Sequence, residues 1–531
     1  MGALQVNGPN GPYVKSAEEM VGRFSAELVG VLPVWKERLM HDPAGLYELE
    51  AEVHAAFARG ADLVVTGLLA LVMKQPTFVD ATEATRQGFA QPLRRGRERK
   101  IQLRLLGGLL VWVTSLYCAV RRPKDAASDE RKRGVYVELA QFGFGKGCSP
   151  ALESTVGRQA ALCPSFQFAA EELERRSVKM DVKTVRRIAT QCGEGMLGLR
   201  AHELDLWRAG KLPAGKELQG KRVSVQFDGG RTRLRGPLRA VAVKAPAVDA
   251  DGFATEDAPG RSRRRPKRTF DADWREPKLV TIFVHDERGR MQKISQATVD
   301  GTFEGPDAMA ELIAMHLHRL GAAKAKSVTF AADGATWIWD RIPVIIEKAG
   351  LKDVPTYEVL DCCHACHHIS LALATLGLNE KQRLPLFRNL RTELRNGHWR
   401  QVVDELTEMA DEFAENDDIR TEIAYLTKHG AAGRLKYPSF RAEGLPLGSG
   451  AIESSIRRVI NLRLKGSGIF WDQTNAEAML QLRAQVITGR WDERIKAMRQ
   501  LELRHGRRDW HREPQAMSIK AEPETPTLEN P

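Results

Sequence analysis

Cysteine is scarce in this 531-residue chain, which contains seven. An odd number of cysteines, four of them isolated at Cys118, Cys148, Cys163 and Cys192, does not resemble the disulfide framework of a secreted domain. The N-terminus also lacks the basic start and apolar run of a secretory signal. Both absences predict a protein of the reducing cytoplasm.

Long hydrophobic runs are missing as well. The most apolar stretch, residues 105–120, is shorter than the roughly 20 residues that a membrane-spanning helix needs. It contains a Gly-Gly pair and is rich in Val, Leu and aromatic residues, so we predict a buried pair of strands that continues through residues 134–139. We expect no association with a membrane.

Charge of one sign dominates, with 80 Lys and Arg residues against 68 Asp and Glu and a formal net charge of +12. This excess favours a polyanionic partner such as nucleic acid, although a solvated charged face explains each single cluster equally well. The densest cluster, Arg261 to Arg268, lies in a Pro-, Asp- and Arg-rich stretch. We predict that this stretch, residues 245–276, is a flexible basic insertion.

The pattern of apolar residues divides the chain into several structural units, as its length predicts. The expected segments are a helical N-terminal region (1–104), a β-rich segment (105–148), a helical region (149–215), an α/β core (220–362 and 445–490) that an all-helical insertion interrupts (363–444), and a disordered tail (505–531). The expected core elements are strands at 223–227, 238–243 and 279–285, a helix from Pro306, a strand at 328–332, a helix at 337–348 and a strand at 357–360. The predicted fold class is therefore α/β, with a mixed sheet.

The helical region contains the outline of a helix-turn-helix, with helices at residues 165–176 and 182–192. The apolar residues of the second helix would pack inward. Lys183, Arg186 and Arg187 would then face outward and contact DNA in the major groove. A plain antiparallel pair of helices explains the same pattern equally well.

Three acidic residues stand at positions that suggest a shared site. Asp228 and Asp333 each end a predicted strand, and Glu453 lies in the first turn of a helix that starts at the turn Gly448-Ser449-Gly450. If the two strands are neighbours, their carboxylates lie close together, and a helix packed across the sheet can bring the third acid within reach. Taken singly, each acid also has an ordinary explanation: an Asp-Gly turn, or a surface ion pair with Arg457.

A divalent metal would explain why three carboxylates gather. Clustered carboxylates raise one another's pKa unless a cation neutralises them, and hard oxygen ligands suit Mg²⁺ or Mn²⁺. Two such ions, about 3.5 to 4 Å apart, can activate a water or a 3′-hydroxyl for in-line displacement at a phosphodiester. We therefore predict that Asp228, Asp333 and Glu453 bind two ions.

The segments around these acids resemble the conserved motifs of bacterial insertion-sequence transposases of the ISKra kind, which are DDE transposases. The matching segments are Phe227-Asp228-Gly229-Gly230, Ala332-Asp333-Gly334, Gly448-Ser449-Gly450-Ala451-Ile452-Glu453 and Arg463-Leu464-Lys465-Gly466-Ser467-Gly468. The resemblance covers residues 105–484. It implies an RNase H-like core with the three acids as catalytic residues. It further implies cleavage at the terminal inverted repeats of its own element, strand transfer into target DNA, and a homo-oligomer on paired ends.

Further candidates follow from the segment Asp361 to His368. The Cys-x₂-Cys pair Cys363 and Cys366 beside histidines suggests zinc, but all candidate ligands fall within two helical turns, whereas zinc sites usually draw on two segments. The alternative is that Asp361 and His364 resemble the D-x₂-H motif that several DDE transposase groups carry beside the active site, which implies catalytic roles. The resemblance also implies that Lys465 approaches a DNA phosphate, although a helix C-cap residue would occupy the same position.

Two other functions remain compatible with the sequence. One is a catalytically inactive, sequence-specific DNA-binding protein derived from a transposase, against which the presence of all three acids speaks. The other is an RNase H-like nuclease, which would share the core and differ only in its substrate.

Overall fold

The computed structural model describes residues 3–87, 93–120, 134–145, 147–237, 270–292, 295–413, 418–466 and 468–505. The chain forms two compact units, Met1–His202 with Asp492–Pro531, and Glu203–Trp491. The strand predicted at 238–243 lies outside the described residues. So do most of the basic insertion and residues 506–531 of the expected tail.

The first unit combines an antiparallel sheet with long helices. Its strands are β1 (Ala3–Val6), β2 (Leu93–Arg104), β3 (Leu110–Val120) and β4 (Gly134–Tyr136). They pair in the order β1-β3-β2, and β4 also pairs with β3. The helices are α1 (Ala17–His41), η1 (Pro43–Gly45), α2 (Leu46–Val72), α3 (Pro76–Gln87), α4 (Val137–Gln141), α5 (Pro150–Leu162), α6 (Phe166–Glu174), most of α7 (Val182–Arg208) and α18 (Trp491–His505).

Several predictions for this unit are wrong. Residues 3–6 and 93–104, expected to be helical, form β1 and β2, and residues 137–139, expected to extend a strand, lie in α4. Most residues of β2 are charged and exposed, so no apolar alternation marks the strand in the sequence. Its conformation comes from backbone pairing with β3 along most of its length. The apolar stretch from residue 105 thus contributes a hairpin turn and one strand of this sheet.

Among the described residues, one helical stretch, Pro43–Val72, is long and apolar enough to cross a membrane. The same stretch contains Asp62, which is buried and accepts a hydrogen bond from the Leu109 amide at 3.0 Å. Burial raises the pKa of Asp62 above its ordinary value. Length and composition are weak grounds for a membrane span here, because a core helix of a soluble protein passes the same test.

Helices α6 and α7 occupy the positions of the predicted helix pair. The Asp181 side chain accepts a hydrogen bond from the Thr184 amide at 2.9 Å and so caps the start of α7. The second helix does not end at Cys192, as predicted, but continues to Arg208. Gly195, within this extension, allows close packing, because a Cβ there would lie 2.6 Å from the sulfur of Met498 in α18.

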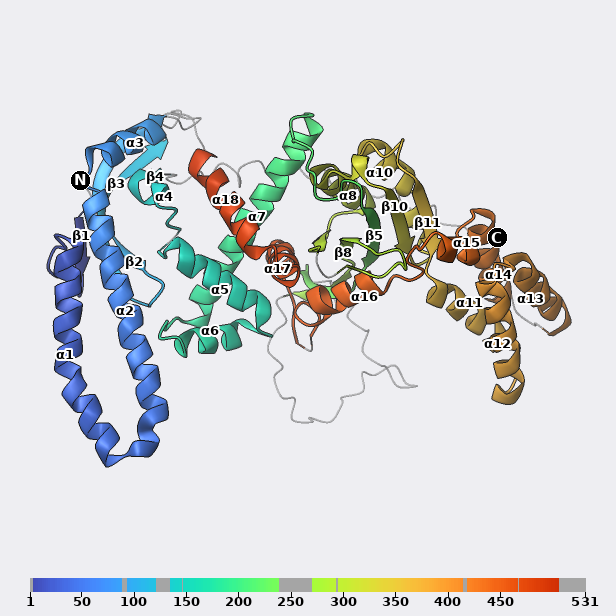
Figure 1. Ribbon diagram of the computed structural model, residues 1–531, viewed down its shortest axis with the longest axis horizontal. Coiled ribbons are helices and arrows are strands. Elements are labelled where there is room, and N and C mark those ends of the chain that lie inside the picture. The colour runs from blue at the N-terminus through green and yellow to red at the C-terminus, as the bar shows by residue number, and fades with distance from the viewer. Residues whose placement is uncertain are drawn as a thin grey trace, which may run out of the picture. The chain divides into compact units, whose positions relative to one another are not determined.

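The second unit is an α/β structure built on a five-stranded mixed sheet in its described part (Figure 1). The sheet strands are β5 (Arg222–Gly229), β8 (Lys278–Val284), β9 (Thr298–Thr302), β10 (Ser327–Ala332) and β11 (Thr356–Leu360). Their order is β11-β10-β5-β8-β9. Strands β5, β10 and β11 are parallel, whereas β8 runs antiparallel to both β5 and β9. A separate hairpin joins β6 (Thr232–Gly236) to β7 (Asp271–Arg275).

Helices cover both faces of the sheet. The helical elements of this unit are α8 (Pro306–Leu320), η2 (Ala322–Lys324), α9 (Thr336–Trp339), α10 (Ile342–Lys348), α11 (Cys362–Ala374), α12 (Glu380–Arg395), α13 (Trp399–Phe413), α14 (Asp418–Ala431), α15 (Tyr437–Ala442), α16 (Gly450–Ile456), η3 (Arg457–Asn461) and α17 (Gln473–Ile487). Apolar side chains on one face of β5, including Val225 and Phe227, share a core with α8. The opposite face meets α16 and α17 (Figure 1).

Several core predictions are confirmed and several are wrong. The strands at 223–227, 279–285, 328–332 and 357–360, the helix from Pro306 and the helical residues between 363 and 444 are all present. By contrast, β6, β7 and β9 were not predicted, and β7 lies within the supposed flexible insertion. The helix expected at 337–348 is two helices, α9 and α10. The helix that carries Glu453 ends at Ile456 and is followed by the π-helical turn η3.

Strand β9 shows why such an element escapes detection. Its sequence, Thr-Val-Asp-Gly-Thr, has the composition of a turn, yet all five residues are buried and pair with β8. The polar Asp300 is tolerated there because its carboxylate lies 2.8 Å from Nε2 of His316 in α8. This contact depends on tertiary structure.

Candidate active site at the ends of the parallel strands

Asp228 and Asp333 lie at the same level on two adjacent parallel strands. Val225 of β5 pairs with Phe330 of β10, and each aspartate stands three residues beyond its member of this pair. Ala332 in turn pairs with Leu360 of β11, so that Asp361, the next residue, continues the same row. The register therefore places three aspartates side by side along one edge of the sheet.

Asp228 is partly buried, and its carboxylate carries an electrostatic penalty. Burial and then the charge of Asp333 raise the pKa of Asp228 to about 6. The hydrogen bond that the Gly229 amide donates to Asp228 at 2.6 Å and the nearby His364 both act in the opposite direction. A cation bound here would remove much of this penalty, because it favours the charged carboxylate.

Asp333 begins the turn between β10 and α9, and its side chain accepts a hydrogen bond from the Ala335 amide at 3.1 Å. Its backbone carbonyl accepts another from the indole nitrogen of Trp339 at 3.0 Å. The next residue, Gly334, has Tyr425 of α14 pressed against it: a Cβ there would lie 2.0 Å from the ring. Glycine at this position thus lets α14 approach the carboxyl end of β10.

Glu453 lies in the first turn of α16, and β5 fixes the position of that helix. Gln226, two residues before Asp228 and on the same face of β5, donates a hydrogen bond to the Gly448 carbonyl at 3.0 Å and accepts one from the Ile452 amide at 3.1 Å. A second link to the sheet joins the hydroxyls of Thr281 and Ser455 at 2.9 Å. These buried contacts position the start of α16 beside the strand that carries Asp228.

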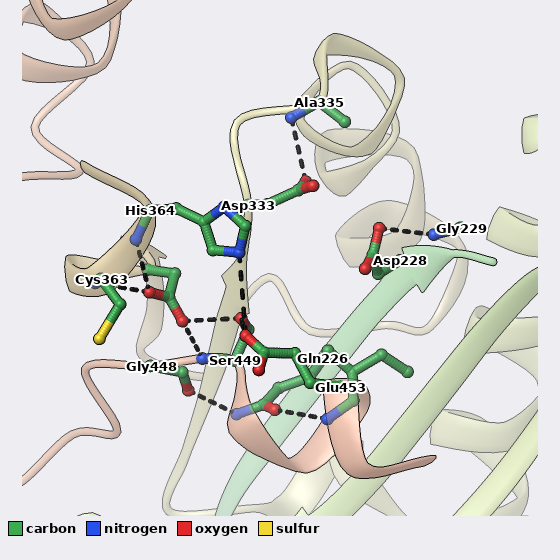
Figure 2. Close-up of polar contacts among 12 residues, drawn as sticks. Gln226, Asp228, Gly229, Asp333, Ala335, Cys363, His364, Gly448, Ser449 and Glu453 are labelled. Atoms are coloured by element: carbon green, nitrogen blue, oxygen red, sulfur yellow. Dashed lines mark hydrogen bonds and ion pairs between the residues drawn. The ribbon is translucent and has the colours of Figure 1, made fainter. Parts of the chain in front are cut away.

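The side chain of Glu453 is about half exposed and extends toward His364 (Figure 2). Its carboxylate lies 3.3 Å from the Ser449 hydroxyl oxygen and 3.8 Å from Nε2 of His364. His364 is itself 40% exposed, so both groups are available to a ligand. The structure thus brings together Asp228, Asp333, Glu453 and His364 from four different elements.

Asp361 makes a different set of contacts from those expected of a residue that touches substrate. Its carboxylate is 2% exposed and caps α11 by accepting hydrogen bonds from the amides of Cys363 at 2.6 Å and His364 at 3.0 Å. Its other oxygen accepts hydrogen bonds from both the amide and the hydroxyl of Ser449, the latter at 2.7 Å (Figure 2). Asp361 therefore ties the start of α11, which carries His364, to the turn that leads into α16.

The donors at this site suit a hard divalent cation in their chemistry. They are carboxylates, they derive from separate elements, and one of them is partly desolvated beside another. As the side chains stand, however, no three His, Cys, Asp or Glu residues in the described part of the chain are gathered closely enough to hold a metal ion. Asp333 is turned toward Ala335 and Glu453 toward His364 (Figure 2), so a common ion requires a rotation of these side chains.

The remaining predicted residues lie elsewhere. Lys465 is exposed just after η3 in the second unit. Lys183, Arg186 and Arg187 are exposed near the start of α7, as the helix-turn-helix hypothesis requires. Cys366 is buried in the core, whereas Cys363 is exposed, so the Cys-x₂-Cys pair does not present both thiols to one ligand; the described cysteines are free.

Sequence reasoning missed two residues, Gln226 and Ser449, that hold the site together. Gln226 is 1% exposed and Ser449 2% exposed. A glutamine two positions before a candidate acid, and therefore on the same face of the strand, is the signal that could have identified Gln226. The sequence marks Ser449 only as part of the turn Gly448-Ser449-Gly450.

Comparisons with known protein families, with curated proteins and with solved structures found no match.

Proposed function

We propose that this chain is a DNA transposase that cleaves and joins phosphodiester bonds with Asp228, Asp333 and Glu453. The observation that carries this proposal is the placement of Asp228 and Asp333 at equivalent levels of adjacent parallel strands, with the helix of Glu453 hydrogen-bonded to the same strand. Carboxylates gathered at one sheet edge favour chemistry on a phosphate over a purely structural role.

The strand topology supports an RNase H-like core. Its first three strands in sequence, β5, β8 and β9, are antiparallel neighbours, and β10 and β11 then add in parallel on the other side of β5. Asp228 lies near the end of the first of these strands, and Asp333 directly follows the fourth. The helices α11 to α15 then separate the last strand from α16, which is the order expected for a core interrupted by an all-helical insertion.

In this proposal Asp228, Asp333 and Glu453 hold Mg²⁺ or Mn²⁺, which we expect as two ions. The metal would supply charge neutralisation at the phosphate and an activated nucleophile. His364, exposed beside Glu453, can donate a hydrogen bond to a phosphate oxygen. Asp361 positions His364 and Ser449 by hydrogen bonds and does not contact the substrate.

The proposed partner is DNA, at the terminal inverted repeats of the protein's own element and at the target. The net charge of +12 favours a polyanion. The exposed residues Lys183, Arg186 and Arg187 at the start of a capped helix are suited to groove contacts, and Lys465 to a phosphate. We further propose a homo-oligomer on paired ends in the bacterial cytoplasm.

Strand cleavage of an oligonucleotide that carries the terminal repeat, read from the DNA flanking the gene, tests the function. With Mg²⁺ or Mn²⁺ the parent should cut, whereas Asp228→Asn and Asp333→Asn should lose on the order of 10²- to 10⁴-fold in rate, because several kcal/mol of transition-state stabilisation disappear. The matched control is Asp340→Asn, an exposed carboxylate in the same unit. Equal cutting by all four proteins would reject the site.

The same assay separates the alternatives. A parent that binds the repeat but cuts no DNA with either metal would indicate an inactive DNA-binding protein. Cutting of an RNA–DNA hybrid in preference to the repeat would indicate an RNase H-like nuclease.

A further inference from the structure

The hairpin β6–β7 grows directly out of the strand pair that carries Asp228. The ladder between β5 and β8 ends at the pair Gly229 and Lys278, and the Gly230 amide then donates a hydrogen bond to the Pro277 carbonyl at 2.8 Å. Arg231 follows at once and leads into β6. The hairpin is therefore fixed to the proposed catalytic edge.

The rest of the unit holds the hairpin in place from one side. The backbone of Trp471 hydrogen-bonds β6 on both sides of Leu234, donating to the Arg233 carbonyl at 3.2 Å and accepting from the Arg235 amide at 2.8 Å. The hydroxyl of Thr232 donates to the Leu464 carbonyl at 2.8 Å. Thr232 and Leu234 are both buried, so this face of the hairpin is its inner face.

The outer face carries arginines interleaved with aromatic rings. Because side chains alternate along a strand, Arg231, Arg233 and Arg235 share this face, and Arg233 pairs across the hairpin with Trp274. The guanidinium groups of Arg231 and Arg233 lie 5.2 and 5.6 Å from the Trp274 ring. Arg235 lies 4.9 Å from the ring of Phe270, which packs 5.3 Å from Phe470. We call this outer face, Arg231, Arg233, Arg235, Phe270, Trp274 and Phe470, the arginine–tryptophan face.

Charge and exposure distinguish this face from an ordinary surface. Trp274 is 49% exposed and is the most exposed tryptophan among the described residues. Within the described residues 231–236 and 270–275, the two acids Asp271 and Asp273 fall on the other face by alternation, and Asp273 pairs with Arg275 at 2.9 Å. The nearest acid in sequence beyond the strand, Glu276, lies 3.2 Å from the ammonium of Lys278.

We propose that the arginine–tryptophan face binds the DNA strand next to the bond that is cut. Trp274 stacks on an unpaired base, and Arg231 and Arg235 contact the phosphates on either side. Lys465 follows Leu464, whose carbonyl accepts the hydrogen bond from the Thr232 hydroxyl. Its ammonium group extends the positive surface at the base of the hairpin. The inference rests on the proposed function for the identity of the strand. A half-exposed indole among cations fits a base and its phosphates because every base has a π-face and every linkage a negative charge.

Binding of a short mixed-sequence single-stranded DNA without divalent metal tests this inference separately from catalysis. Trp274→Ala should weaken binding about 5- to 100-fold, the usual effect of losing one stacked base, and Trp274→Phe should recover part of it. Because Trp274 is half exposed, thermal unfolding of both variants should match the parent. Tyr47→Ala, which removes an exposed aromatic ring from α2 of the other unit, is the control and should bind as the parent does.

The salt dependence of binding tests the arginines. Arg231→Gln and Arg235→Gln should each lower the slope of log affinity against log salt by about 0.7, whereas Trp274→Ala should leave the slope unchanged. Arg290→Gln, which replaces another exposed arginine of the same unit, is the control. Heparin, which has charge but no bases, should bind Trp274→Ala as well as the parent.

Parent-like DNA binding by Trp274→Ala would overturn the inference, as would equal losses for DNA and heparin. A clear preference for RNA over DNA strands, lost in Trp274→Ala, would also overturn it as stated. If strand binding depends on Trp274 but no DNA is cleaved with metal, the inference stands and the proposed function fails. If the parent cleaves and Trp274→Ala binds normally, only the inference fails.

Discussion

Replacement of Asp361 by asparagine separates a positioning residue from a catalytic one. The carboxylate accepts four hydrogen bonds, two on each oxygen, from the amides of Cys363 and His364 and from the amide and hydroxyl of Ser449. The side-chain oxygen of asparagine can still accept hydrogen bonds from the amides of Cys363 and His364. Its NH₂ group would then face the Ser449 amide, so that two hydrogen-bond donors oppose each other. The Ser449 hydroxyl can rotate to accept from it, but the buried amide cannot.

The cost follows from this count of bonds. One buried backbone amide left without an acceptor costs about 1–3 kcal/mol, and the loss of charge from the remaining bonds adds to it, so we expect Asp361→Asn to lower the free energy of unfolding by about 3 kcal/mol. With an m-value of about 3 kcal/mol/M, the urea midpoint falls by about 1 M. Asp307→Asn, which removes an 89% exposed carboxylate from a surface ion pair, should shift it by less than about 0.3 M because such pairs contribute at most about 1 kcal/mol.

The assay is equilibrium urea unfolding followed by circular dichroism, together with cleavage measured well below the midpoint. A positioning role predicts lost stability and a partial loss of cleavage, with the metal concentration for half-maximal cleavage changed little. Unchanged stability with complete loss of cleavage would refute this reasoning and would indicate that Asp361 contacts the substrate. Asp361→Ala, which removes the acceptor of all four hydrogen bonds, should be less stable than Asp361→Asn.

Two further predictions concern the helices beside the site. Gly334→Ala should destabilise the protein by about 1–3 kcal/mol, because the new Cβ would overlap the Tyr425 ring. In a protein that already carries Tyr425→Ala, the glycine replacement should be nearly neutral. Additive losses of stability in the double mutant would contradict the proposed clash. Burial and then the charge of Arg434 lower the pKa of His429 to about 4, so below pH 6.5 the unfolded chain takes up a proton that the folded chain does not. Protonation of this histidine in the unfolded chain should therefore lower the parent's free energy of unfolding by about 2 kcal/mol between pH 7 and 4.5, and His429→Gln should not show this loss. Parallel curves of unfolding free energy against pH for the two proteins would disprove the lowered pKa of His429.

Much of the central sheet was predictable because its strands are short segments rich in β-branched and aromatic residues. Val223, Val225 and Phe227 alternate with Ser224 and Gln226, whereas Val328 to Ala332 is largely apolar. An Asp-Gly pair follows each of the two segments and marks the strand end. The helix from Pro306 was equally clear from its apolar spacing. Strand β9 and the hairpin β6–β7 were not, because their sequences are polar and their conformation depends on partners distant in the chain.

The candidate site divides in the same way. The sequence alone determined which acids are available and that two of them end strands, because residue type and local periodicity are properties of short segments. Only the tertiary structure decided that β5 and β10 are neighbours in register and that Gln226 and Ser449 hold the helix of Glu453. It also decided that the Asp361 carboxylate accepts hydrogen bonds from backbone amides and from the Ser449 hydroxyl. These facts depend on pairing between residues up to about two hundred positions apart, as in the bond from Gln226 to the Gly448 carbonyl. Such pairing is set by packing of the whole unit, which no local pattern encodes.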